Sequence, residues 1–214
     1  MQKPKTKSYP LVTFAVDNIG LVQTPAATGA QSLVLDGALA VGGVLPQQSL
    51  AYIIGITCAG DETGRTFTII GTDADGKAQT EAAFAGVNAG VAKSTLFYRS
   101  VTSIVVDDDT AGTLKVGTVA TTLVAQSPTY CLDIYQPHTS VAVNIGGTIN
   151  FSVLKCFQRP TAGETLNFVA GGISAQAADT DTAYTAPTGG VRLQVNSYSA
   201  GATASVSFAQ SRIT

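Results

Sequence analysis

The sequence predicts an all-β protein, built as two small antiparallel β-sandwich or jelly-roll-like domains with a short extended N-terminal arm. Two observations lead to this prediction. Short apolar or β-branched runs recur at intervals of roughly 8 to 12 residues, with Gly, Asn, Asp and Pro between them, which is the spacing of strands in sandwiches and barrels. Helical periodicity is nearly absent from the 214 residues. A third observation bears on the surroundings of the protein: charged residues make up only 12% of the chain, about half the usual share.

The N-terminal arm and its lead-in are expected over residues 1–30. Three lysines lie near its start: Lys3, Lys5 and Lys7. The apolar run that follows, Leu11–Val16, is bounded too closely by Pro10 and Asp17 to be a signal peptide. We therefore expect a protein made in the cytoplasm, with a short basic arm.

The first β domain is expected over residues 31–125 and the second over residues 126–214, because the strand pattern relaxes near residues 121–129. A loop-like surface excursion is expected over residues 171–190, which are rich in Ala, Thr, Gly and Asp. The candidate strands are Ser32–Leu35, Ala51–Cys58, Arg65–Ile70, Ala78–Phe84, Tyr98–Val106, Thr113–Gly117, Ser140–Ile145, Thr148–Phe157, Glu164–Val169, Val191–Ser197 and Ala202–Gln210.

For some of these elements, alternation and turn residues also predict which side chains face the core and where the chain turns. Along Val191–Ser197 every second residue is apolar, so Val191, Leu193 and Val195 should face the core. Gly146–Gly147 predicts a tight two-residue hairpin. Asp73–Gly76 predicts a turn in a second hairpin; it resembles part of a calcium loop, but flanking strands and missing ligands favour the turn. The acidic run Asp107–Asp109 is interpreted as a solvated turn.

No motif in the sequence supports catalysis or cofactor binding. The three cysteines, Cys58, Cys131 and Cys156, are widely spaced and lack a His cluster, so we expect buried free thiols and neither a disulfide framework nor a metal site. No nucleophile elbow or phosphate-binding loop occurs. We expect no enzyme activity, no catalytic residues and no cofactor. The net charge of −2 argues against nucleic acid as a partner.

The low charge leaves three interpretations: a membrane protein, a secreted or aggregating β protein, or a subunit covered by its neighbours. No apolar run reaches the roughly 20 residues of a spanning helix, so no membrane association is expected. The candidate contacts between subunits are the basic residues Lys3, Lys5, Lys7, Arg99 and Arg192. A solubilising role is an equal alternative for the two arginines.

Two blocks resemble virion proteins of tailed phages. The first runs through Thr66–Lys77, Gly86–Gly90, Phe97–Ile104 and Ala111–Gly117, and the second through Gly147–Val153, Val191–Ser197 and Ala204–Gln210. The resemblance implies a particle component, either a capsid decoration (cement) protein or a piece of the collar, connector or tail. It carries over no catalytic residue.

The leading functional hypothesis is a decoration protein that clamps the assembled phage head, made in the bacterial host cytoplasm and located in the virion. We expect a homo-oligomer, with a trimer favoured, and the major capsid protein or another virion subunit as partner. A collar, adaptor or tail component is the alternative within the same class. From a different class, a carbohydrate- or receptor-binding module stays open, with four tyrosines as candidate stacking residues: Tyr130, Tyr135, Tyr184 and Tyr198.

Overall fold

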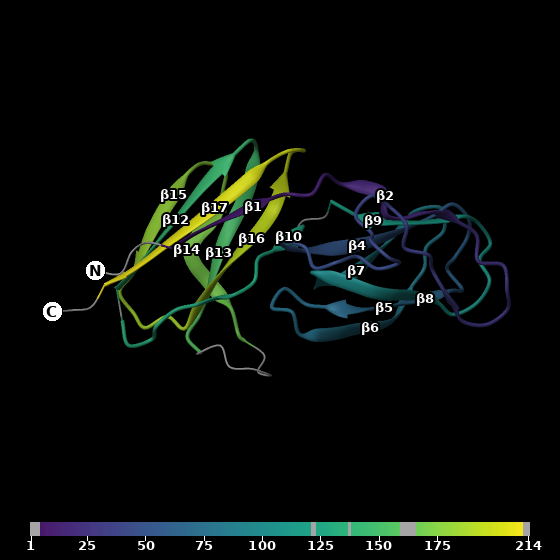
Figure 1. Ribbon diagram of the computed structural model, residues 1–214, viewed down its shortest axis with the longest axis horizontal. Helices are drawn as coiled ribbons and strands as arrows, with labels where there is room; N and C mark the ends of the chain where they lie inside the picture. The colour runs from purple at the N-terminus through teal and green to yellow at the C-terminus, as the bar shows by residue number, and fades with distance from the viewer. Residues whose placement is uncertain (1–4, 121–122, 137, 159–165, 212–214) are drawn as a thin grey trace. The chain divides into compact units, whose positions relative to one another are not determined.

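The computed structural model describes residues 5–120, 123–136, 138–158 and 166–211, and its regular elements are β-strands (Figure 1). The strand pairings given below are all antiparallel, which confirms the predicted fold class. The described residues include no helix long and apolar enough to cross a membrane. The chain separates into two compact units: unit 1, residues 1–13 with 122–214, and unit 2, residues 14–121.

Unit 2 contains two four-stranded sheets, one in the order β2–β9–β4–β7 and the other in the order β3–β8–β5–β6. Their strands are β2 (Ala15–Gln23), β3 (Gln31–Ser32), β4 (Ala51–Cys58), β5 (Thr66–Thr72), β6 (Ala78–Ala85), β7 (Val91–Tyr98), β8 (Ser100–Val106) and β9 (Leu114–Thr118). Ile54 and Ile56 of one sheet and Phe67 and Ile69 of the other are fully buried in a single cluster. Because residues of both sheets share this cluster, the core of the sandwich lies between the sheets. Burial of such side chains contributes about 1.5–3 kcal/mol each.

The predicted hairpin between β5 and β6 is present, with Thr72 paired to Ala78. Its turn is organised by the carboxylate of Asp73, whose Oδ1 accepts hydrogen bonds from the amides of Asp75 and Lys77, both at 2.9 Å. Gly76 has a positive φ of 82°, which glycine adopts at little cost. The motif that resembles part of a calcium loop therefore closes a hairpin.

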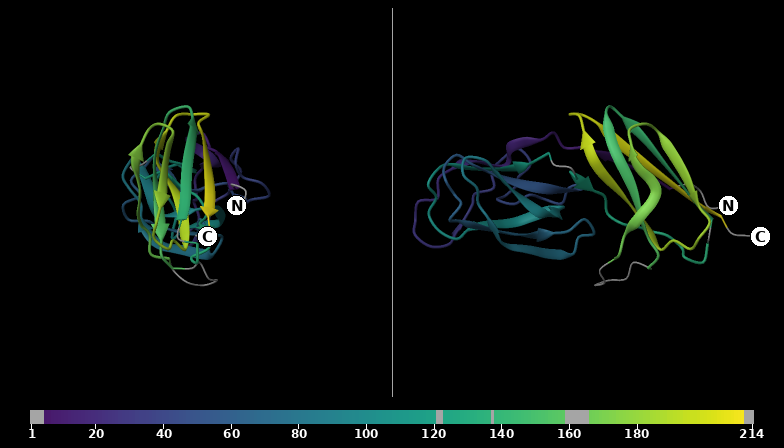
Figure 2. Two further views of the ribbon diagram at one scale, coloured as in Figure 1. Left: turned by 90° about the vertical axis from the view of Figure 1, so that its left-hand side faces the viewer. Right: turned by 180° about the vertical axis from the view of Figure 1, so that it is seen from behind.

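Unit 1 also contains two sheets, one in the order β1–β17–β12–β15 and the other in the order β14–β13–β16, with β10 and β11 both paired to β16. Its strands are β1 (Lys5–Pro10), β10 (Ala125–Gln126), β11 (Tyr130–Cys131), β12 (His138–Gly146), β13 (Ile149–Cys156), β14 (Val169–Gln176), β15 (Thr180–Tyr184), β16 (Gly190–Tyr198) and β17 (Thr203–Ser211). Figure 2 shows these strands from behind. The predicted alternation in β16 is confirmed, because Val191, Leu193 and Val195 are buried.

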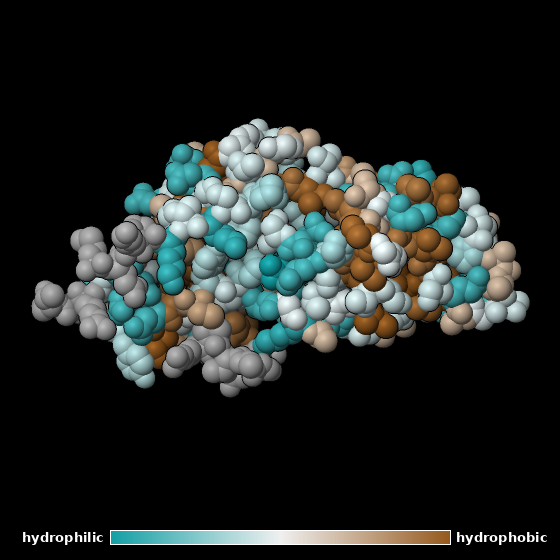
Figure 3. Space-filling model, viewed as in Figure 1, coloured by the Kyte–Doolittle hydropathy of each residue, from teal (hydrophilic) through white to brown (hydrophobic). Residues whose placement is uncertain are grey.

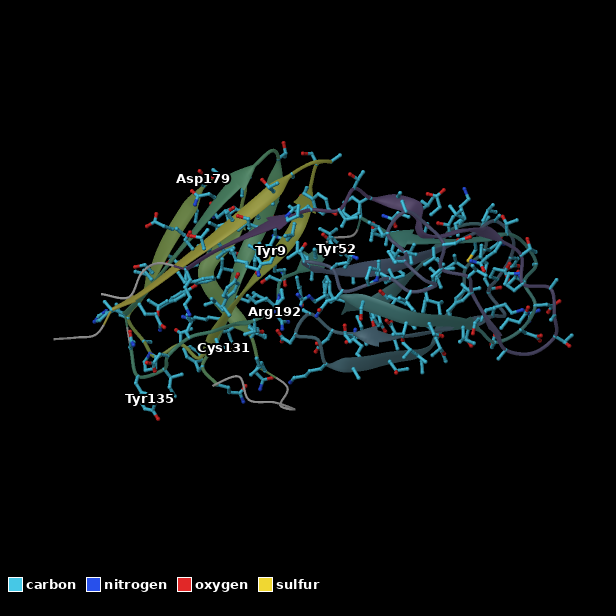
Figure 4. The ribbon with its side chains drawn as sticks, in the orientation of Figure 1. Tyr9, Tyr52, Cys131, Tyr135, Asp179 and Arg192 are labelled. Atoms are coloured by element: carbon cyan, nitrogen blue, oxygen red, sulfur yellow. The ribbon has the colours of Figure 1, made fainter. Side chains whose placement is uncertain are left out.

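Tyrosine hydroxyls join the two sheets of unit 1. Tyr9 of β1 donates a 2.9 Å hydrogen bond to the hydroxyl of Tyr130 in β11, and the ring of Tyr130 lies 4.2 Å from that of Phe208 in β17. A second such bond runs from β15 to β14, where the hydroxyl of Tyr184 donates to the carbonyl of Gly171. Tyr9, labelled in Figure 4, is buried. These contacts satisfy buried phenols that would otherwise carry a desolvation cost.

The N-terminal segment differs from the predicted arm and lead-in. Residues 5–10 form edge strand β1, whose Thr6 and Ser8 hydroxyls each bond a serine of β17 at 2.8 Å. Residues 15–23 form β2 in the other unit. The chain therefore leaves unit 1 after residue 13 and returns at residue 122, whereas we predicted domain boundaries at residues 30 and 125.

The Gly146–Gly147 turn does not form the predicted hairpin. It joins β12, which pairs with β15 and β17, to β13, which pairs with β14 and β16, so the chain passes from one sheet to the other. Gly147 has a positive φ of 83°, as a tight turn requires, but a tight turn does not decide which strands pair. The predicted excursion over residues 171–190 also contains most of β14 and all of β15. The predicted strand Glu164–Val169 lies partly outside the described residues.

Candidate interaction surfaces

The basic N-terminal residues lie on an edge strand. In the register of β1, Lys5 and Lys7 stand opposite the buried Phe208 and Val206 of β17, on the core-facing side, yet both are exposed. Lysines placed this way on an edge strand discourage pairing with a further strand. Their position explains how the edge is protected, and a contact of these lysines with another subunit stays a prediction. Lys3 lies outside the described residues.

The two candidate arginines are engaged within the chain. Arg99 donates from Nε to the carbonyl of Gln48 at 2.8 Å. Arg192, labelled in Figure 4, donates to Gln126 Oε1 at 3.1 Å and to Thr129 Oγ1 at 3.0 Å, and its guanidinium lies 4.4 Å from the ring centroid of Phe168. The planar guanidinium of arginine can stack on an aromatic ring and donate several hydrogen bonds at once. Here it links β16 to Gln126, Thr129 and Phe168. Arg99 belongs to unit 2, whereas Lys5, Lys7 and Arg192 belong to unit 1.

A flat surface of small side chains covers one sheet of unit 1, and we call it the hydroxyl face. It consists of the outward-facing residues of four strands, namely Thr6 and Ser8 (β1), Thr203, Ser205, Ser207 and Ala209 (β17), Ser140, Ala142 and Asn144 (β12), and Asp181 and Ala183 (β15). The strand register aligns them in rows; one row runs Thr6, Ser207, Ala142 and Asp181. Asp181 is the one charged member, so this face can approach another flat surface with little desolvation of charge.

Unit 2 carries an apolar surface that sequence reasoning missed, and we call it the apolar ribbon. Its backbone consists of β2 and the antiparallel segment 33–41 beside it. Val34 donates from its amide to Gln23 Oε1 at 2.8 Å and accepts from Gln23 Nε2 at 3.0 Å. Farther along, Gly37 donates to the carbonyl of Ile19 at 3.0 Å and Leu39 to that of Asn18 at 2.7 Å. These bonds hold the two segments side by side.

The ribbon exposes five large apolar side chains: Val16, Leu21, Val22, Val34 and Val41. Their exposed fractions run from 42% for Val16 to 68% for Val41. Figure 3 shows hydrophobic residues gathered over the part of unit 2 that carries β2 and β9. An exposed apolar group of this kind marks an interaction site more often than single scattered residues do. The signal in the sequence was the valine and leucine content of residues 16–41, within the predicted lead-in and first strand.

Carboxylates of the acidic run Asp107–Asp109 interact with nearby residues of the same unit. Asp107 accepts from the amide and the hydroxyl of Thr66, at 3.0 and 2.7 Å, and Asp109 forms a 2.7 Å ion pair with Arg65. Partial burial opposes ionisation of Asp107, but the bonds from Thr66 prevail and lower its pKa. The predicted turn is therefore present, and it is braced by β5.

The remaining candidate chemistry is dispersed. Cys58 and Cys156 are buried as expected, but Cys131 is exposed, which corrects the prediction for that thiol. Burial raises the pKa of Cys58. The described residues contain no group of three or more His, Cys, Asp or Glu side chains placed to hold a metal ion. Of the four tyrosines predicted for stacking, Tyr184 is buried, Tyr130 and Tyr198 are half-buried, and Tyr135 is exposed. They do not form one platform for a sugar.

Comparisons with known proteins give little further information. No protein-family model matches the chain, and no curated protein matches it. The crystal structure of the PBSX exported protein XepA aligns with 13% identity and a TM-score of 0.26, over 95% of this chain and 94% of that one. The major capsid protein P2 from bacteriophage PM2 aligns with 9% identity and a TM-score of 0.22, over 98% of each chain. Likenesses this low carry no argument about function, so the proposals below depend on the residues.

Proposed function

We propose that the chain is a non-enzymatic structural protein of a tailed-phage particle, and that within the particle it is a decoration protein bound to the assembled head. The assignment to a phage particle is supported by the two sequence blocks that resemble tailed-phage virion proteins. The observation that carries a packing role is the hydroxyl face, where four strands present small and almost uncharged side chains. The cores of protein–protein interfaces are depleted of charged residues, and Asp181 is the one charged member of this face.

Many identical contacts over a shell make a weak single contact sufficient, because each bound copy limits the freedom of the subunits it touches. A flat face of Ser, Thr and Ala fits this use. Its short side chains lose little conformational entropy on contact, and its hydroxyls can exchange water for hydrogen bonds to a partner. The expected partner is the major capsid protein or another virion subunit, and the expected assembly is a homo-oligomer, with a trimer favoured.

The proposal is tested on particles that lack this protein. We expect them to assemble but to release DNA at a lower temperature, or after a milder osmotic shock, than complete particles, and we expect purified protein to restore their resistance. Ser140→Lys places a long charged side chain on the exposed hydroxyl face and should abolish the restoration. Thr80→Lys, on exposed edge strand β6 of the other unit, is the matched control and should restore it fully. Equal stability of complete and depleted particles would refute the decoration role.

Counting copies per particle separates this proposal from a collar, adaptor or tail component. A decoration protein is present in hundreds of copies, whereas a component of a single vertex is present in about a dozen or fewer. Quantitative mass spectrometry of purified particles gives this number directly. A low count would leave the protein a structural component and move it to the vertex or tail.

A further inference from the structure

Strand β1 has a straight outer edge, the edge that faces away from β17. The register of β1 on β17 runs from Lys5 to Pro10 without a bulge, and the amide of Leu11 continues it by donating to the carbonyl of Ala202 at 3.1 Å. Hydrogen-bonded and non-hydrogen-bonded pairs alternate along an antiparallel ladder, so the backbone groups of Thr6 and Ser8 point away from β17. Among the described residues, these outward amides and carbonyls have no hydrogen-bond partner.

Other sheet edges are closed or distorted within the chain. On β7 the carboxylate of Glu81 accepts from the amides of Thr95 and Leu96, at 2.7 and 3.3 Å. The edge strands β6 and β14 each contain an alanine with positive φ where the register shifts, Ala83 at 55° and Ala175 at 50°. Bulges of this kind bend an edge and interrupt its row of donors and acceptors. The regular outer edge of β1 is therefore better suited to receive a further strand.

The charge along this edge indicates the kind of strand it would accept. Lys5 and Lys7 alternate with Thr6 and Ser8, their side chains are exposed, and neither lysine forms an ion pair with a residue that the structure describes. A strand added beside β1 would place side chains directly opposite both lysines, with Cβ atoms about 4.5–5.5 Å apart. Opposite charges stabilise such a pair and like charges destabilise it, so carboxylates are favoured at these two positions.

A second copy of β1 does not meet this requirement. An antiparallel two-fold pair that used the outward groups of both Thr6 and Ser8 would place Lys7 directly opposite its own copy. Two ammonium groups at that spacing repel each other. The lysines thus discourage pairing between identical edges and at the same time favour a different, acidic strand.

From these observations we infer that the outer edge of β1 binds an extended segment of a partner protein that carries acidic side chains at alternate positions. The segment would exchange backbone hydrogen bonds with Thr6 and Ser8, and its carboxylates would pair with Lys5 and Lys7. Its remaining side chains would continue the hydroxyl face, where small residues fit. The inference concerns the chain itself and does not depend on the phage assignment.

The experiment titrates the full-length protein with a capped peptide of about eight residues in which Glu alternates with Thr. We expect the peptide to bind at concentrations up to roughly the millimolar range. At saturation, hydrogen exchange of the Thr6 and Ser8 amides should slow at least about tenfold, whereas the Lys5 and Lys7 amides, which already point toward β17, should change little. A peptide of the same composition, with its glutamates in one block, has equal charge without the alternation and should bind more weakly.

Lys7→Glu tests the charge. It should weaken binding of the alternating Glu–Thr peptide at least about tenfold and should allow binding of an alternating Lys–Thr peptide. Lys93→Glu is the matched control, because Lys93 is also exposed on an edge strand, β7 of the other unit, and this variant should bind like the wild type. Circular dichroism and the unfolding temperature verify that both variants fold.

The inference is refuted if the wild type does not bind the alternating peptide, or binds it without slower exchange at Thr6 and Ser8. Equal binding of the block peptide, or equal effects of Lys7→Glu and Lys93→Glu, would also overturn it, because charge alone would then explain the binding. Loss of particle restoration by Ser140→Lys with normal peptide binding would leave this inference intact. The two proposals therefore fail separately.

Discussion

At the scale of single residues, several buried polar groups have specific hydrogen-bond partners that the sequence pattern does not reveal. Asn18 donates to Thr118 Oγ1 at 2.7 Å and accepts from the amide of Thr118 at 2.9 Å, so a polar residue can occupy a buried position in β2. Asp17, Asn18 and Gly20 interrupt the apolar alternation in this segment, which was predicted to belong to the lead-in. The environment of Arg192 could not be predicted from the local sequence either, because its stacking partner Phe168 is 24 residues away.

Tyr184 gives the molecule a dependence on alkaline pH. Burial raises the pKa of Tyr184 to about 12, from an ordinary value of 10.0. The folded state therefore favours the protonated phenol. Its contribution to stability is fully present below a pH of about 10 and is lost as the pH rises through about 12. We expect the unfolding temperature of the wild type to fall over this interval.

Tyr184→Phe removes the ionisable group and should make that fall smaller. At neutral pH the same change should cost about 1 kcal/mol, because the hydroxyl no longer donates to the carbonyl of Gly171. Thermal unfolding followed by circular dichroism at a series of pH values measures both effects. Tyr135→Phe is the control, since Tyr135 is exposed. Identical alkaline curves for wild type and Tyr184→Phe would contradict the assignment.

At the scale of strands, the sequence located well those elements that are continuous and apolar. The predicted strand Ala51–Cys58 coincides with β4, and the β5–β6 hairpin is present at the predicted turn. Strand pairing was harder to predict from the sequence, as the Gly146–Gly147 turn shows. Both flanking segments have the alternation of strands, but they belong to different sheets of unit 1: β12 pairs with β17, and β13 pairs with β16. β-Pairing is determined by contacts far apart in sequence, which local patterns do not contain.

Gly117 shows how closely two strands of unit 2 approach. A Cβ atom at this position would lie 1.9 Å from the carbonyl oxygen of Ala15 and 2.6 Å from the carbonyl carbon of Val16. Because both atoms belong to the backbone, Gly117→Ala must displace β2 from β9. We expect the free energy of unfolding to fall by about 3 kcal/mol, at the upper end of what overpacking costs.

Chemical denaturation of the full chain measures this loss. Gly64→Ala is the control in the same unit, because a Cβ there would meet no atom within 4 Å, and it should change stability by less than about 0.5 kcal/mol. Equal stability of the two variants would show that β2 can shift without cost.

At the scale of the whole molecule, β1 and the eight strands β10–β17 belong to one unit, and β2–β9 belong to the other. The total strand content and the low charge were evident from composition, but this interrupted arrangement was not. It depends on the pairing of Lys5–Pro10 with Thr203–Phe208, across almost the full length of the chain. The first segment has no apolar run that would predict such a partner.

Deletion of residues 1–10 should therefore destabilise unit 1 selectively. It removes the buried Tyr9 and uncovers the edge of β17, and we expect a loss of about 3 kcal/mol or more in that unit. Hydrogen exchange measures this directly: amides of β12 and β17 should lose protection, while those of β4 and β5 keep it. Deletion of residues 1–4 alone, which precede β1, should leave both groups protected. Uniform loss of protection would show that the two units unfold as one.

The pairing of β1 with β17 also determines the order in which the molecule can be completed during translation. Every strand of unit 2 has been synthesised by residue 121, long before β17. Unit 2 can therefore fold while β1 still lacks its only partner strand among the described residues. β1 is thus made before all of unit 2 but can find its place only after β17 has emerged.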